Sequence, residues 1–136
     1  MTALTAMPAL HAAALWSGLS ILLLVLLSLS TILTRRRLKV SFGDGGHTEL
    51  TAASRAFGNA AEYIPAGMIV LVLMALLGCQ STWVHAVGAT LLLGRLLHAW
   101  GITRTKQPAF GRVFGMVLTQ LALIGGAAVL IACAVT

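Results

Sequence analysis

The chain has 136 residues, of which 59% are hydrophobic and only 9% are charged, and its mean hydropathy is +0.97. Soluble domains carry roughly 25% charged residues, so this composition excludes an ordinary soluble fold and predicts an integral membrane protein. The net charge of +6 comes from basic residues that flank apolar segments, a pattern typical of cytoplasmic loops and not of nucleic-acid binding.

The first apolar segment, residues 8–33, is long enough to span a bilayer as a helix. Basic residues follow this run instead of preceding it, so we expect a retained transmembrane helix and not a cleaved signal peptide. The loop predicted over residues 34–49 contains a Gly-Asp-Gly-Gly turn, without the Gly-Lys-Ser/Thr continuation of a phosphate-binding loop. Thr48 is expected to cap the next helix, with Thr51 as the alternative.

The second helix is predicted over residues 50–78. It places Arg55, Asn59 and Glu62 within about 60° of arc on one face. We expect Arg55 at the membrane interface and Glu62 about 6 Å inside the hydrocarbon. An ionised group inside a bilayer is costly unless it is paired or faces water, so this face is a predicted functional site.

After a short turn at residues 79–82, the third helix is predicted over residues 83–102. Arg95 and His98 stand at i and i+3 on this helix. Because Arg95 and Glu62 lie at similar depths on neighbouring antiparallel helices, we expect an ion pair between them. A purely structural role for this pair, and for His98 as a hydrogen-bond donor within the bundle, is the alternative.

A polar loop is predicted over residues 103–109, followed by the fourth helix over residues 110–135, with Arg112 near its start. Gly125-Gly126-Ala127-Ala128 is expected to give this helix a smooth face for close packing. Eight cations gather at one end of the resulting bundle, and the other end has none. The positive-inside rule therefore places the basic end in the cytoplasm and both termini outside.

The cysteines and histidines have no metal-ligand spacing, so no metal site is expected. Cys79 and Cys133 both fall near the outer ends of their predicted helices. An oxidising compartment on that side would permit a disulfide within or between subunits, provided that the Cα atoms come within about 7 Å.

The polar groups of the basic end suggest a binding site for a small anion. Arginine binds carboxylates in a bidentate manner, and a nearby cation favours the thiolate form of a thiol. These groups therefore point to a small, charged, thiol-bearing molecule beside a cleft for an apolar partner. The residues are Arg35, Arg36, Arg55, Asn59, Glu62, Arg95, His98 and Arg112.

At these residues the sequence resembles the membrane-associated proteins in eicosanoid and glutathione metabolism, the MAPEG family. The resemblance covers nearly the whole chain, and residues 1–136 are expected to form one four-span domain. It rests on Arg55-Ala56-x-x-Asn59-x-x-Glu62-Tyr63-x-Pro65 and on Gly94-Arg95-x-x-His98. It rests further on Arg112, on Phe42-Gly43-Asp44-Gly45-Gly46 with Glu49-Leu50, and on the basic end of the first helix, Arg35 to Val40.

The resemblance implies an all-α, four-helix membrane bundle, assembled as a homotrimer, with glutathione bound between subunits near the cytoplasmic face. It implies a transferase or peroxidase that uses glutathione as co-substrate against lipophilic electrophiles or lipid hydroperoxides in a bacterial inner membrane. Carried over residue by residue, Arg36, Arg55, Asn59, Glu62 and His98 would bind glutathione. Arg95 and Arg35 would support the site, and Arg112 would activate the thiol.

The sequence departs from the family pattern at Ile102 and Met116, where eukaryotic members place tyrosines, and at Val113, where a serine is common. These departures leave open a non-catalytic protein that binds a lipid or another anion. A small four-span proton-coupled exporter is a third alternative. It is disfavoured because such proteins carry their essential acid in the first helix, which has none here.

Overall fold

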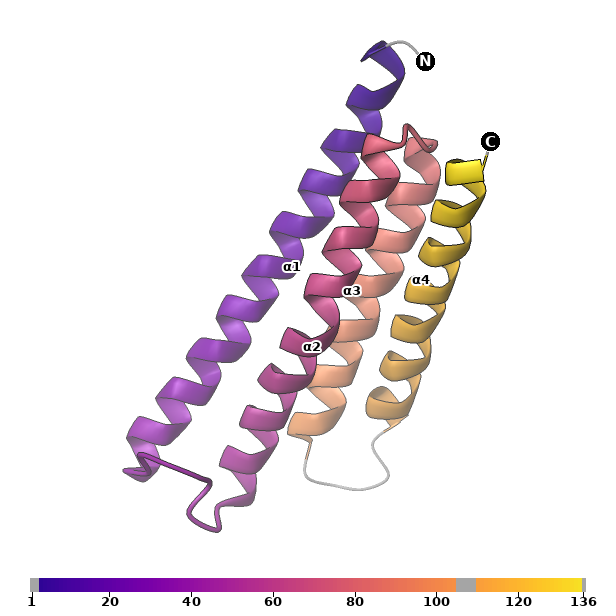
Figure 1. Cartoon of the computed structure of the whole chain (residues 1–136). Coiled ribbons are helices and arrows are strands. Elements are labelled where there is room, and N and C mark those ends of the chain that lie inside the picture. Colours follow the sequence, from indigo (N-terminus) through magenta and orange to yellow (C-terminus); the bar gives the residue numbers. More distant parts are fainter. Residues whose placement is uncertain (1–2, 105–109, 136) are drawn as a thin grey trace.

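The computed structural model describes residues 3–104 and 110–135, and these residues form four long helices without a strand (Figure 1). The helices are α1 (Ala3–Leu38), α2 (Thr48–Leu76), α3 (Ser81–Thr103) and α4 (Phe110–Val135). Each is long and apolar enough to cross a membrane. The predicted four-span, all-α fold class is therefore confirmed.

The predicted helix ends are wrong by a few residues in three helices, and the bounds of α4 are as predicted. α1 continues to Leu38 because its three last-turn arginines are good helix formers and interact favourably with the helix dipole. The cap prediction for Thr48 is also wrong. Thr48 is the first helical residue of α2, and His47 occupies the N-cap position without a side-chain bond. α3 begins at Ser81, two residues earlier than predicted.

α2 and α3 form the centre of the bundle. α2 contacts the other three helices, and so does α3, whereas α1 and α4 do not touch each other. The two termini lie at one end of the bundle and the α1–α2 loop lies at the other (Figure 1). α3 ends and α4 begins at that second end. Residues 105–109, part of the predicted polar loop with Lys106, fall outside the described residues.

Glycines bring α3 and α4 close together near the basic end. A Cβ atom on Gly101 would overlap the backbone of Arg112, and a Cβ atom on Gly115 would overlap the backbone of His98. Gly94 faces Thr119 in the same close manner. The prediction of a smooth face holds for Gly126, which packs against Val70 and Val87. It is wrong for Gly125, beside which a Cβ would meet nothing.

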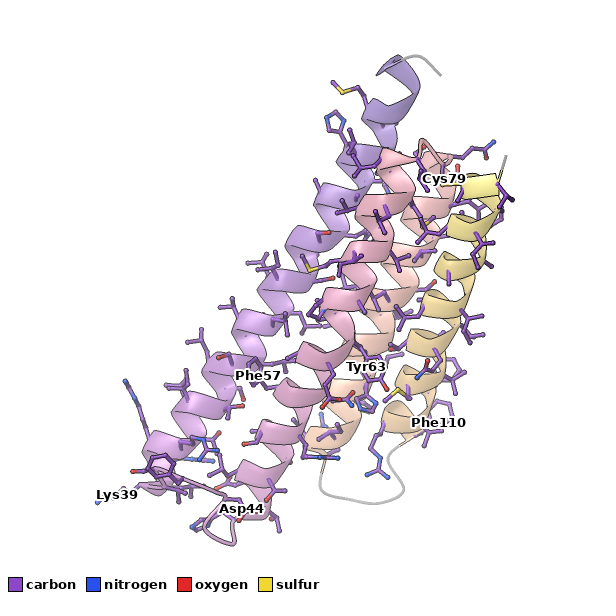
Figure 2. The ribbon with its side chains drawn as sticks, in the orientation of Figure 1. Lys39, Asp44, Phe57, Tyr63, Cys79 and Phe110 are labelled. Atoms are coloured by element: carbon purple, nitrogen blue, oxygen red, sulfur yellow. A yellow bond between two sulfur atoms is a disulfide. The ribbon has the colours of Figure 1, made fainter. Side chains whose placement is uncertain are left out.

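At the end that holds the termini, Cys79 and Cys133 form a disulfide within the chain, with Cα atoms 6.3 Å apart. The bond links the turn between α2 and α3 to the last turns of α4 (Figure 2). Small side chains of α1 and larger ones of α2 and α3 form a buried cluster beside it. The hypothesis of a disulfide is thus confirmed in its intramolecular form.

Candidate functional site

A large open cavity lies at the basic end, between α2, α3 and α4. Its volume is about 830 Å³. Four of the predicted site residues line it together: Arg55 and Asn59 from α2, His98 from α3 and Arg112 from α4. Three different helices therefore bring these side chains to one place.

Arg95 lies buried beside this cavity and holds one of its lining residues. It is 1% exposed, and its guanidinium donates from Nε to Thr119 Oγ1 (2.8 Å) and from Nη1 to Asn59 Oδ1 (2.6 Å). Its Cζ also lies 5.0 Å from the centroid of the Tyr63 ring, on the side of α2 that faces α3 and α4 (Figure 2). A buried cation needs such partners, because an unpaired charge in an apolar interior is strongly disfavoured. Arg95 thereby fixes the Asn59 amide at the cavity wall.

The His98 side chain forms a hydrogen bond with the backbone of Arg112. The Nδ1 atom of His98 lies 2.7 Å from the carbonyl oxygen of Arg112. A carbonyl oxygen only accepts, so Nδ1 carries the proton, and in the neutral ring Nε2 is left as an acceptor. This bond, with the close contact at Gly101, holds the first turn of α4 and so positions the Arg112 side chain.

The cavity combines a positive end with an apolar wall. Within the described residues, no carboxylate forms an ion pair with Arg55 or Arg112. Two unpaired arginines favour an anionic ligand, and a planar guanidinium suits a carboxylate. Val113, Val117 and Leu121 of α4 form an apolar wall that continues away from this end. The arrangement can therefore hold a polar anion beside a lipophilic molecule.

The chain is similar to known membrane proteins. The sequence model of the MAPEG family matches residues 13–132. The chain belongs to the MAPEG family. It is also 42% identical over 88 residues to the inner membrane protein YecN of Escherichia coli strain K12, covering 65% of this chain and 67% of YecN. The YecN of Escherichia coli strain CFT073 matches equally well.

This MAPEG chain differs from the prediction at Glu62. Its expected ion pair with Arg95 is wrong for the protomer, because Arg95 bonds to Asn59 and Thr119 instead. Glu62 is exposed, midway along α2 and about 21 Å from either end. No described residue forms an ion pair with it. Its carboxylate therefore points away from the interior of its own bundle.

Arg35 and Arg36 also lie apart from the main cavity. They line a second, smaller cavity at the end of α1. Since α1 and α4 do not touch, these arginines and Arg112 do not share a site within one copy of this MAPEG chain. The predicted site residues thus fall into four places on the protomer: the main cavity, the buried position of Arg95 beside it, the end of α1 and the exposed face of α2.

Several polar residues of the site were not predicted from the sequence. Thr119 and Tyr63 hold Arg95, while Thr48, Thr51 and Gln120 line the main cavity. A sequence signal existed for Thr119, which lies seven residues after Arg112, near the same helix face. The positions at which this chain departs from the family pattern, Ile102, Val113 and Met116, line the cavity too.

Proposed function

We propose that this protein binds glutathione in the main cavity, in a bacterial inner membrane. The glutathione thiolate forms a thioether with a lipophilic electrophile and displaces its leaving group, or two glutathione molecules reduce a lipid hydroperoxide to an alcohol and water and are oxidised to the disulfide. The observation that carries the proposal is the convergence of Arg55, Asn59, His98 and Arg112, predicted separately, on one cavity with an apolar wall. The inner membrane location of the two YecN relatives supports the proposed compartment.

Each group has a role that its position supports. Arg55 binds a glutathione carboxylate, and the Asn59 amide, held by Arg95, binds the peptide part. Arg112 lies beside the apolar wall and has no ion pair with any described residue. A cation there would stabilise the thiolate, the reactive form of the thiol. The electrophile enters along Val113, Val117 and Leu121.

The exposed carboxylate of Glu62 favours assembly into a homotrimer. An ionised group facing lipid in the middle of a membrane helix is costly, and another copy of the chain would cover it. The same assembly would let Arg36, with Arg35 beside it, approach glutathione bound to a neighbouring subunit. Glutathione would then lie between subunits, in contact with Glu62 and the α1 arginines as well as with the main cavity.

The direct test is turnover by an Arg112→Ala variant. Glutathione conjugation of a lipophilic aryl halide, or reduction of a fatty-acid hydroperoxide, should fall at least about 100-fold, as for loss of a group that stabilises developing negative charge. Its thermal unfolding midpoint and oligomer size should match the unmodified protein. Unchanged turnover by this variant would contradict the proposed role of Arg112 in stabilising the thiolate.

A second function, non-catalytic binding of a lipid or another anion, is favoured by one observation. Ile102, Val113 and Met116 put apolar side chains in the cavity wall and supply no hydroxyl to a thiolate. A hydrogen bond of this kind contributes about 1 kcal/mol, so three fewer donors would weaken glutathione binding and activation. Glutathione binding without turnover of either substrate class would select this function.

A further inference from the structure

A second cavity, of about 430 Å³, lies where α1 ends and turns into the α1–α2 loop. It is separate from the main cavity and shares no lining residue with it. Its walls carry three cations, one hydroxyl and two apolar side chains: Arg35, Arg36, Lys39, Ser41, Ile32 and Val40.

Lys39 has an unusual backbone conformation that shapes this cavity. Its φ is 57°, and among the described residues it is the one non-glycine residue with a positive φ. The Lys39 N–H donates to the Arg36 carbonyl (3.3 Å) and the Val40 N–H to the Arg35 carbonyl (3.1 Å), which ends α1 in a Schellman cap. Glycine suits this position best, and a lysine here adds a cation to the cavity wall.

The acidic side chains near this cavity are engaged elsewhere. Glu49 forms an ion pair with Arg37, and the Asp44 carboxylate accepts from Thr51 Oγ1 and from the Gly46 N–H. Arg35 donates one N–H to the Gly43 carbonyl (2.7 Å), which leaves its other donors free. Within the described residues, none of the three cavity cations has a carboxylate in an ion pair. The cavity is therefore a site for an anion.

The position of the cavity favours an anion that carries an apolar tail. It lies at the basic end of α1, and Ile32 joins it to the exposed apolar face of that helix, where Leu29 and Leu33 are also exposed. The anionic group of such a molecule would contact the cations of the cavity, and its apolar tail would lie along this face of α1. Phosphate provides several acceptor oxygens for lysine, arginine and hydroxyl donors at once.

We propose that this cavity binds the phosphate of an anionic phospholipid, with Lys39, Arg35 and the Ser41 hydroxyl as its donors. The acyl chains would lie along the face of α1 below Ile32. A free phosphate ester offers the same oxygens without the tail, so the experiment must separate the two. The proposal does not depend on glutathione turnover. Because Arg35 and Arg36 are also proposed to approach glutathione, the test uses Lys39.

The delipidated full chain in a neutral detergent is titrated with phosphatidylglycerol, phosphatidylcholine and glycerol phosphate, and binding is followed by native mass spectrometry. Phosphatidylglycerol should bind more tightly than the other two, and Lys39→Gln should weaken it about fivefold, the contribution of one lysine near an anionic headgroup. Arg104→Gln, which removes a cation beside Trp100 outside the cavity, should leave that affinity unchanged.

A Lys39→Gly variant separates binding from folding. Glycine adopts a positive φ without strain, so the thermal unfolding midpoint should stay or rise while phosphatidylglycerol affinity falls. Several results would overturn the proposal: equal affinity for the two lipids, unchanged affinity in Lys39→Gly, glycerol phosphate binding as tightly as the lipid, or displacement of the lipid by glutathione.

Discussion

Arg95 is the residue on which the geometry of the main cavity depends. It is buried, it holds Asn59 and Thr119 by hydrogen bonds, and it faces the Tyr63 ring. A lysine would keep the charge but could not reach Thr119 and Asn59 with a rigid fork of donors. Arg95 therefore works by positioning Asn59, and it does not line the cavity itself.

A double-mutant cycle measures this role. Arg95→Met and Asn59→Ala should each destabilise the protein, and the double variant should be less destabilised than the sum of the two. The expected coupling is about 1.5–3 kcal/mol, the range for a hydrogen bond to a charged group. Reversible unfolding in mixed micelles provides the free energies, and strictly additive effects would show that the bond contributes nothing.

Asp44 gives the α1–α2 loop a pH dependence. Hydrogen bonds from Thr51 and from the Gly46 N–H lower the pKa of its carboxyl below the usual 3.8. A lowered pKa means that the carboxylate stabilises the folded state above pH 3.8, and that this contribution is lost as pH falls through the folded pKa.

The matched variant is Asp44→Asn, which keeps the size of the side chain and removes the charge. The unmodified protein should have the higher thermal unfolding midpoint at neutral pH, and the two midpoints should converge below pH 3.8. A difference between the two proteins that persists undiminished in acid would contradict the role given to the carboxylate.

At the residue scale, the sequence predicted the members of the main cavity better than their partners. Arg55, Asn59, His98 and Arg112 were identified from residue type, spacing and family resemblance. The partner of Arg95 was predicted wrongly because Asn59 and Glu62 lie only about 60° apart on α2. The rotation of α2 about its axis decides which of them faces α3, and packing across the whole bundle sets that rotation.

At the scale of elements, the contact between α3 and α4 positions Arg112. Gly101 and Gly115 let the two backbones approach, and the His98–Arg112 hydrogen bond forms across that contact. The lengths of the four helices follow from apolar composition. The glycines that matter at this contact could not be selected from the sequence, because a glycine in a membrane helix looks the same whether or not a neighbour approaches it.

Two glycine substitutions on α4 test this contact. Gly115→Ala would place a methyl group against the backbone of His98 and should destabilise the protein by about 1–3 kcal/mol, as overpacking does. Gly125→Ala is the control, since a Cβ there meets nothing and alanine favours helix. The pair is compared by thermal unfolding and by turnover, and equal behaviour would show that the contact is loose.

At the scale of the whole molecule, the disulfide and the basic residues mark opposite ends of the bundle. Cys79, bonded to Cys133, lies at the end with the termini, and Lys39 lies at the opposite end (Figure 2). Lys39 follows the three arginines in the last turn of α1. An intact disulfide requires an oxidising compartment, and the positive-inside rule puts the basic end in the cytoplasm. Both arguments predict the same orientation, with the termini outside.

Labelling of the cysteines tests that orientation and the bond together. In intact cells, a membrane-impermeant maleimide should modify Cys79 and Cys133 only after reduction. Loss of the bond should lower stability by about 2–4 kcal/mol, measured with Cys133→Ser. The opposite orientation would be indicated if the reduced thiols do not react with the reagent in intact cells but do react in inverted vesicles.

The central claim, that the main cavity binds glutathione and favours its thiolate, is tested most directly by titrating the purified, reconstituted protein with glutathione. Calorimetry gives the affinity, and the ultraviolet absorbance of the thiolate gives the ionisation state of the bound thiol. We expect saturable binding with a thiolate band. Arg55→Ala should weaken the binding at least tenfold, a loss of about 1.4 kcal/mol, and Arg112→Ala should remove the thiolate band. The absence of saturable binding by the unmodified protein would contradict the account.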